Sequence, residues 1–346
     1  MRSQAEHQAR LAEIVRDDPV LWRALTEAAA FDLPDSWIVS GAVYNSVWNA
    51  LTGRAPGHGI KDIDLFYFDP DTSWEAEDKV IQRGATHFSA NPPVEIRNQA
   101  RVHLWYRDRF GHQIPAFLNS VHSLEHFTSE THAVGVRLAG TEIEICAPYG
   151  LDAIFGLRMV PNTRNLNRAT HEAKSARAKT LWPEVTFVPW PEVTVITGQP
   201  WHDWELIRDL VARAFSSMVG RIDPPSSLNA MSPEDFQTEA AAGTAILAHD
   251  GFALTGCVLC KPKDDALYVG KLAVDPGHQR QGIGSALMDA ARAEAQRRGL
   301  ARLELQTRIE LVENCQTFVK MGFIKTGETA HPGFDRSTSI TMTKSL

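Results

Sequence analysis

The stretch LYVGKLAVDPGHQRQGIGSALMDAARAEAQRRG (267–299) decides how the second half of this 346-residue chain folds. An apolar run ending at Val274 is typical of a buried strand, and DPG (275–277) is a turn sequence. QRQGIG (279–284) then opens an amphipathic helix. N–H groups in the first turn of a helix have no partner within it, and glycines let a ligand approach the backbone. The junction therefore predicts a binding site for a phosphate group.

This junction, together with ARLELQTRIELVENCQTFVKMGFIKTGE (301–328), resembles the GNAT superfamily of N-acetyltransferases. QRQGIG matches the superfamily's motif for the pyrophosphate of acetyl-CoA, and Gly322-Phe323 falls where its last helix ends. The resemblance covers about residues 193–346 and implies a splayed mixed sheet with the pantetheine between two parting strands. The acetyl-CoA contacts that it implies are Leu272, Ala273, Val274, Gln279, Arg280, Gln281, Gly282, Ile283, Gly284, Ser285, Asn314 and Phe318.

Proton transfer in the implied reaction has several candidate residues. Many members of the superfamily carry a tyrosine four residues before the helix-ending glycine, where it protonates the leaving thiolate, but this chain has Phe318 there. A thiolate with a pKa of about 8.5 leaves tolerably well unaided. Tyr268 and a water molecule are the alternative proton donors, and Glu310 and His331 are the candidate bases.

A second group of charged residues stands in the first half of the chain. Asp62 and Asp64 are two residues apart on a predicted strand, so their side chains share one face. Glu95, on another predicted strand, completes three carboxylates, which are the hard oxygen ligands that Mg²⁺ prefers. Two such ions can clamp a nucleoside triphosphate and an attacking hydroxyl.

The order of these elements resembles the DNA polymerase β-type nucleotidyltransferase superfamily. EIRNQARVHLWY (95–106) and APYGLDAIFGLRMVPN (147–162) are similar to a bacterial family of nucleotidyltransferase-like proteins, and the likeness covers about residues 10–190. It implies a metal site at the three carboxylates and nucleotide binding near Gly41. The chain departs from the pattern in having Gly41-Ala42 instead of Gly-Ser or Gly-Gly, and in a 21-residue gap from Gly41 to Asp62.

We predict an α/β (α+β) chain with two domains, 1–190 and 191–346, joined near the repeated WPEV that begins at Trp182 and Trp190. The repeat is either a linker or an edge strand. In the first domain the patterns predict two helices divided at Pro19, a helix over 43–51, and strands over 37–40, 63–68, 94–98, 101–108, 133–138 and 142–147. In the second they predict helices over 202–214, 282–298 and 311–321, and strands over 244–248, 252–261, 266–274, 302–306, 323–328 and 338–343.

Composition limits the partners. A net charge of −7 argues against nucleic acid and favours a cationic substrate. No apolar run approaches ~20 residues, so we expect a cytoplasmic protein without a membrane partner. His122-x-x-Glu125-His126 has an inverted zinc-protease spacing with both histidines on one helical face, but we interpret it as a chance pattern. Cys257 and Cys260 lie three apart on a strand and should face opposite sides of a sheet as buried thiols.

The sequence thus predicts a bifunctional transferase. One domain is an acetyl-CoA-dependent N-acetyltransferase acting on a small amine, and the other is a nucleotidyltransferase-like domain that uses Mg²⁺ and a nucleoside triphosphate. Two alternatives stay open: the first domain is only a nucleotide sensor or scaffold, or the chain is a non-catalytic acetyl-CoA sensor. The acceptor amine and the oligomeric state cannot be predicted from these patterns.

Overall fold

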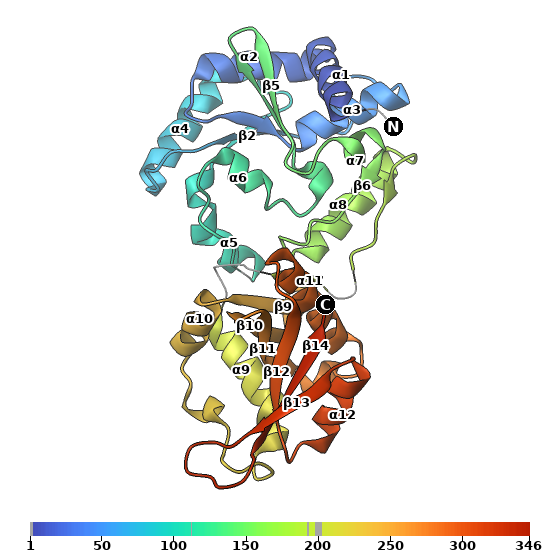
Figure 1. Cartoon of the computed structure of the whole chain (residues 1–346). Coiled ribbons are helices and arrows are strands. Elements are labelled where there is room, and N and C mark those ends of the chain that lie inside the picture. The colour runs from blue at the N-terminus through green and yellow to red at the C-terminus, as the bar shows by residue number, and fades with distance from the viewer. Residues whose placement is uncertain (1–2, 112, 192–193, 198–202) are drawn as a thin grey trace. The chain divides into compact units, whose positions relative to one another are not determined.

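The computed structural model describes residues 3–111, 113–191, 194–197 and 203–346. The chain divides into two compact units, residues 1–191 and 192–346, each with its own hydrophobic core (Figure 1). No helix within the described ranges is long and apolar enough to cross a membrane.

The first unit is built on a five-stranded mixed sheet in the order β3-β2-β1-β4-β5. Only β2 and β3 run parallel, and α4 (Trp74–His87) is the crossover between them. The strands are β1 (Trp37–Val39), β2 (Ile63–Tyr67), β3 (Val94–Asn98), β4 (Gly135–Ala139) and β5 (Glu142–Cys146). The remaining elements are α1 (Gln4–Asp17), α2 (Pro19–Phe31), α3 (Gly41–Thr52), α5 (Val102–Phe110), α6 (Ser120–Leu124), α7 (Asp152–Phe155), β6 (Arg158–Met159), α8 (Arg168–Leu181) and β7 (Thr186–Phe187).

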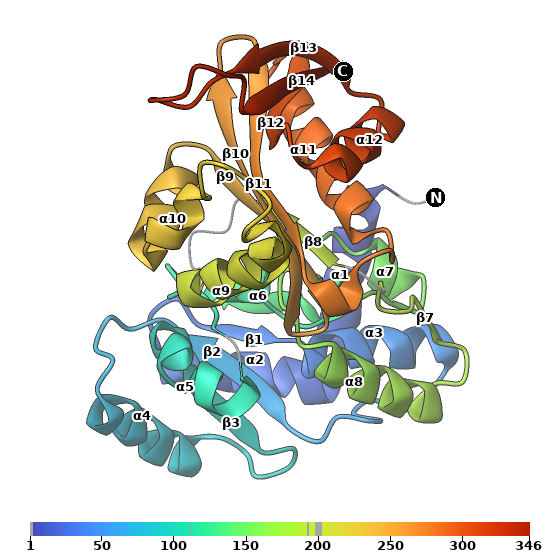
Figure 2. The same ribbon diagram turned by 90° about the horizontal axis from the view of Figure 1, so that it is seen from below.

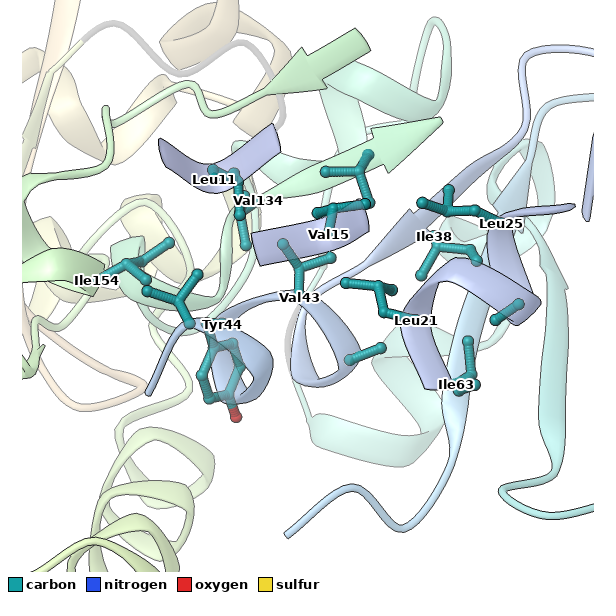
Figure 3. Close-up of a cluster of buried hydrophobic side chains, with 14 of the residues drawn as sticks. Leu11, Val15, Leu21, Leu25, Ile38, Val43, Tyr44, Ile63, Val134 and Ile154 are labelled. Carbon is teal, nitrogen blue, oxygen red and sulfur yellow. The ribbon is translucent and has the colours of Figure 1, made fainter. Parts of the chain in front are cut away.

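Helices α1, α2 and α3 pack their apolar faces on the sheet (Figure 3). The predicted division at Pro19 is confirmed: Asp18 accepts hydrogen bonds from the N–H groups of Val20 and Leu21 (2.9 and 3.1 Å), and the proline fits the first turn of α2. In Figure 3 the ring of Tyr44 joins this cluster while its hydroxyl points away from it. Tyr44 therefore belongs to the core and also lines a cavity at the start of α3.

Two local predictions in this unit are wrong. Residues 101–108 are not a strand, because the buried side chain of Asn98 accepts from the N–H of Ala100 and ends β3. The chain continues as α5, which buries Val102 and Tyr106 at helical spacing. The histidines at 122 and 126 do not share a helical face either, since α6 ends at Leu124.

The second unit is a seven-stranded mixed sheet in the order β13-β14-β12-β11-β10-β9-β8. Its strands are β8 (Thr194–Thr197), β9 (Thr244–Asp250), β10 (Ala253–Lys263), β11 (Ala266–Val274), β12 (Arg302–Arg308), β13 (Ile324–Thr329) and β14 (Ser339–Ser345). Its helices are α9 (Trp204–Phe215), α10 (Pro233–Ala241), α11 (Ile283–Arg297) and α12 (Val312–Lys320). The first WPEV copy leads into β7. Trp190 of the second copy is buried beside His171 in the first unit, and residues 192–193 lie outside the described residues.

Helices cover both faces of this sheet, as Figure 2 shows, with α9 and α10 on one side of the long strands and α11 on the other. Cys257 packs in the α9–α10 core and Cys260 in the α11 core, which confirms that the two thiols face opposite sides. The sheet is splayed as predicted. β11 and β12 run parallel and pair only over 266–268 and 302–304, after which each strand keeps only its other neighbour.

The long gap between Gly41 and Asp62 contains α3 and then a loop, residues 53–62, which is held against the end of α8. Trp182 donates from Nε1 to Oδ1 of Asn49 (3.0 Å), and Asn49 donates from Nδ2 to the carbonyl of His58 (3.0 Å). Gly59 has a φ of +76°, and a Cβ there would lie 2.4 Å from Cη2 of Trp182. Only glycine fits this close approach, which fixes the backbone immediately before Asp62.

We predict that Gly59→Ala destabilises the first unit by about 3 kcal/mol, since a left-handed alanine costs about 1–2 kcal/mol and Trp182 must also move. Gly53→Ala is the matched control, because Gly53 has a φ of +70° with no atom within 4 Å of the added Cβ. It should lose only about 1 kcal/mol in urea unfolding. Equal losses in the two variants would contradict the packing of this loop.

Candidate functional sites

The start of α11 presents a free turn of backbone. Gly282, at the N-cap, has a φ of +83°, and no side chain caps this end of the helix. The segment 279–282 is exposed, and Arg280 also adopts a left-handed φ of +63°. The N–H groups of the first turn (283–285) are therefore available to an anion, and the positive end of the helix dipole lies beside them.

Strand β11 carries a bulge just before this turn. Gly270 pairs with Leu259 and Ala273 with Cys257, so the two residues 271 and 272 face one residue of β10. Because β12 has already diverged, neither Lys271 nor Leu272 has a ladder partner on either side. The strain is visible in the left-handed φ of +49° at Lys271, whose ammonium pairs with Glu239. The bulge leaves the backbone of these two residues outside both ladders where the strands part, and the carbonyl of Lys271 accepts only from Sγ of Cys257 at 3.8 Å among the described side chains.

A cavity of about 240 Å³ opens between the parted strands. Five residues predicted from the sequence line it together: Tyr268, Leu272, Asn314, Phe318 and His331. The other predicted residues lie outside its lining. Ala273 and Val274 end β11, residues 279–285 form the start of α11, and Glu310 lies in the turn between β12 and α12.

Tyr268 stands where the two strands separate. Its ring packs closely on the backbone, since a Cβ added at Gly270 would lie 3.3 Å from Cε1 of Tyr268. Burial raises the pKa of the Tyr268 hydroxyl, and the nearby carboxylates of Glu239 and Glu304 raise it further. The hydroxyl is therefore protonated near neutral pH and can donate a proton or a hydrogen bond, but it cannot act as a base.

Hydrogen bonds to Thr338 hold the ring of His331 in place. The hydroxyl of Thr338 donates toward the carbonyl of Thr329 (3.4 Å) and accepts from the N–H of His331 (2.9 Å). It also lies 2.6 Å from Nδ1 of His331. In the tautomer in which Nδ1–H donates to this hydroxyl, Nε2 is the proton acceptor of the ring.

Glu310 lies in a different environment from the one expected of a base. Although burial favours its neutral form, hydrogen bonds from backbone N–H groups and the charges of Arg308 and Arg336 outweigh burial and lower the pKa of Glu310. Its carboxylate accepts from the N–H of Asp223 (3.2 Å) and lies 3.6 Å from Nε of Arg308. This pairing favours His331 over Glu310 as the base.

The first unit holds a cavity of about 320 Å³ at the start of α3. Gly41, Asp62 and Asp64, all predicted from the sequence, line it. Helix α3 begins after Ser40, which has the unusual φ and ψ of 56° and −116°, and no side chain caps this helix start. The carbonyl oxygen of the Asn45 side chain is buried in the same lining without a hydrogen-bond partner. The cavity thus offers unpaired polar groups to a ligand.

Two cations on α8 complete this cavity, and neither was predicted from the sequence. Lys174 and Arg177 line it opposite the aspartates, and Arg177 donates to the carbonyl of Gly59 (2.8 Å). Burial raises the pKa of Asp64 to about 6, although Lys174 opposes the shift. Burial likewise lowers the pKa of Lys174 against the attraction of Asp64 and Asp62. Lys174 is therefore the buried counter-charge of the aspartates.

Glu95 lies on β3, the strand beside that of Asp64. It pairs in register with Asp64 on the neighbouring strand, but its half-exposed carboxylate lies 3.7 Å from Arg97. Within the described ranges, no group of three or more His, Cys, Asp or Glu side chains is arranged to hold a metal ion. Glu95 is nevertheless close enough to Asp64 for its charge to raise the pKa of that carboxyl, and its role as a metal ligand stays a prediction.

Family models match both units. A model described as "Acetyltransferase (GNAT) family" matches residues 204–323, and one described as "Nucleotidyltransferase" matches residues 26–187. The chain carries a nucleotidyltransferase domain followed by a GNAT acetyltransferase domain. The splayed sheet and the uncapped α11 belong to the GNAT domain, and the cavity at α3 belongs to the nucleotidyltransferase domain.

Individual relatives are distant. The mycothiol acetyltransferase of Kocuria rhizophila is 31% identical over 100 residues, which are 28% of this chain and 32% of that protein. The match therefore spans about a third of that relative. A CCA-adding enzyme head domain is 24% identical, with 52% and 95% of the two chains covered and a TM-score of 0.45. The ribosomal-protein-S18-alanine N-acetyltransferase of Escherichia coli is 20% identical, with 44% and 93% covered and a TM-score of 0.34.

We predict that Lys174→Met lowers the free energy of unfolding of the first unit by about 3 kcal/mol, because a buried charge then loses its partner. Adding Asp64→Asn should restore much of the loss, since a neutral amide needs no counter-charge. Urea unfolding of the two single variants and the double variant measures this coupling. Strictly additive losses would show that Lys174 and Asp64 are not coupled.

Proposed function

We propose that the chain is an acetyl-CoA-dependent N-acetyltransferase that acts on a small amine. One observation carries the proposal: a single segment, 268–285, leads from the cavity between the parted strands to the uncapped start of α11. A ligand with an anionic end and a reactive end joined by an extended arm matches this path. Acetyl-CoA has those parts and supplies the acetyl group as a thioester.

Different residues along this path bind different parts of the cofactor. N–H groups at 283–285 receive the pyrophosphate, and Gly282 lets it approach the backbone. The backbone of the bulge at Lys271 and Leu272, which lies outside both ladders, receives the pantetheine, with Asn314 of α12 on the same cavity. The other predicted contacts, at 273–274 and 279–281, lie between these two ends of the segment.

The cavity also holds groups suited to both proton transfers. His331 accepts a proton from the acceptor amine at Nε2, which makes the nitrogen nucleophilic. Tyr268 keeps its hydroxyl proton near neutral pH and can pass it to the departing sulfur. Phe318 packs edge-on against Phe323 at 6.0 Å and forms an apolar part of the lining. Tyr268 of β11 thus takes the role of the tyrosine that is absent at position 318 of α12.

Acetyl-CoA binding tests this assignment. Gly282→Asp places a carboxylate at the helix start, so we expect the dissociation constant measured by calorimetry to rise at least tenfold, or ~1.4 kcal/mol. Gly299→Asp is the control, because Gly299 also has a positive φ (+70°) and open space but follows the other end of α11. An unchanged dissociation constant in Gly282→Asp would place the cofactor elsewhere.

A second candidate function belongs to the first domain. We infer that its cavity binds a nucleoside triphosphate, with phosphates at the uncapped start of α3 and beside Lys174 and Arg177. Asp62 and Asp64 offer the oxygen ligands that Mg²⁺ prefers, so a magnesium requirement stays a prediction. Nucleotidyl transfer also needs an acceptor hydroxyl in this cavity, whereas nucleotide sensing does not.

Nucleotide binding can be measured on the whole chain with each triphosphate, with and without Mg²⁺ or Mn²⁺. Asp62→Asn with Asp64→Asn should abolish magnesium-dependent binding and leave acetyl-CoA binding unchanged, because the two cavities lie in separate units. If the wild-type protein binds no triphosphate with either metal, the first domain is a scaffold.

A further inference from the structure

One wall of the acetyl-transfer cavity is apolar and has no part in the proposed binding of the cofactor. Phe215, Met218 and Ile222 line the cavity there, and all three side chains are partly buried. They come from the end of α9, from the 3-10 helix Ser216–Met218 and from the loop after it. The cofactor is assigned instead to the segment 268–285 and to α12. This α9 wall (Phe215, Met218 and Ile222) is therefore available to the acceptor.

Arg308, at the end of β12, holds the α9 wall and the base on one side of the cavity. Its Nη1 donates to the carbonyl of Pro224 (2.8 Å), two residues after Ile222. Its Nε donates to the carbonyl of Thr338 (3.1 Å), and the hydroxyl of Thr338 lies 2.6 Å from Nδ1 of His331. One guanidinium thus joins the loop that carries Ile222 to the hairpin that carries His331. An amine bound at His331 has the rest of its molecule beside the α9 wall.

The charged groups of the lining are already paired. Among the described lining residues, Lys271 and Arg308 carry the permanent charges. Lys271 pairs with Glu239, and Nε of Arg308 lies 3.6 Å from a carboxylate oxygen of Glu310. A second charge on the acceptor would leave water without gaining a counter-charge, which is costly. The cavity therefore favours an acceptor that carries no charged group besides its amine.

We propose that the acceptor is a small primary amine whose remaining part is apolar and uncharged, and that Met218 and Ile222 select it. This inference rests on the proposed acetyl transfer and adds the substrate class. The net charge of −7 favours a cationic substrate for the chain as a whole, but the paired charges of the lining act at the cavity itself. A volume of about 240 Å³ is below the ~300–1,000 Å³ of drug-sized pockets, so the acceptor is small.

The apolar part of the acceptor does not react. The amine nitrogen forms a bond to the acetyl carbonyl carbon, and the thioester C–S bond breaks. The amine proton passes to Nε2 of His331, and the sulfur takes the proton of Tyr268. Proton exchange with water then restores both residues, and the products are an uncharged amide and a free thiol.

The test compares acceptors of one length that differ in the group at their far end. n-Pentylamine ends in a methyl group, putrescine in an ammonium group and γ-aminobutyrate in a carboxylate. Each is offered with acetyl-CoA, and release of the free thiol gives kcat/KM. We expect the value for n-pentylamine to be at least tenfold above that for either charged analogue. The value for n-propylamine should be at least tenfold below that for n-pentylamine, because each buried methylene contributes about fourfold.

Met218→Glu tests the α9 wall directly. It adds a carboxylate without a partner on a side chain of similar length, so kcat/KM should fall at least tenfold for n-pentylamine and rise for putrescine. A loss of packing alone would not raise the activity with one amine. Val219→Glu is the matched control, because Val219 is the next residue but is 76% exposed and lies outside the cavity lining. It should keep the wild-type preference.

Ile222→Ala adds no charge and remains informative if Met218→Glu does not fold. It should lower kcat/KM for n-pentylamine at least tenfold and change the value for γ-aminobutyrate less than threefold. Equal losses on all amines in both variants would show that the α9 wall is only structural, which overturns the inference.

Charged analogues that react as well as n-pentylamine would also overturn the inference while leaving acetyl transfer intact. The same holds if the wild-type protein binds acetyl-CoA but acetylates none of these amines. If the wild-type protein does not bind acetyl-CoA, the proposed function itself fails.

Discussion

The separation of β11 from β12 is the constraint on which the acetyltransferase domain depends. The two strands share a ladder over only three residues each, 266–268 and 302–304. Beyond that point β12 stays paired with β14, and β11 stays paired with β10 through a bulge at Lys271. A continuous ladder would close the cavity and pair the backbone groups of the bulge. The opening therefore creates at once the cavity, the free backbone and the path to the start of α11.

The cavities of the two domains are similar in their backbone and differ in the charged residues that line them. Both cavities adjoin secondary structure with unpaired backbone, at the uncapped start of α3 in one domain and at the bulge of β11 in the other. The first cavity buries two aspartates against Lys174, so its own charges are balanced before a ligand enters. In the second, Lys271 pairs with Glu239 and Arg308 with Glu310. The first cavity therefore suits a ligand that brings both anionic phosphates and cations.

Local sequence predicted most of the elements, because their signals are short-range: caps such as Asp18, turns and hydrophobic periods. The strand predicted over 101–108 failed where a single side chain, Asn98, ended β3 and α5 began. The grouping of Tyr268, Phe318 and His331 followed from the resemblance to a known fold. Lys174 could not be foreseen, since it acquires its role from Asp64, which is far away in the chain.

A structure of the protein with coenzyme A tests the central claim most directly, because it locates both ends of one ligand. The account predicts the pyrophosphate on the N–H groups of 283–285 and the arm along the bulge of β11. It also predicts the thiol in the cavity beside Tyr268 and His331. A pyrophosphate bound away from α11, or a thiol outside the gap between β11 and β12, would contradict the account.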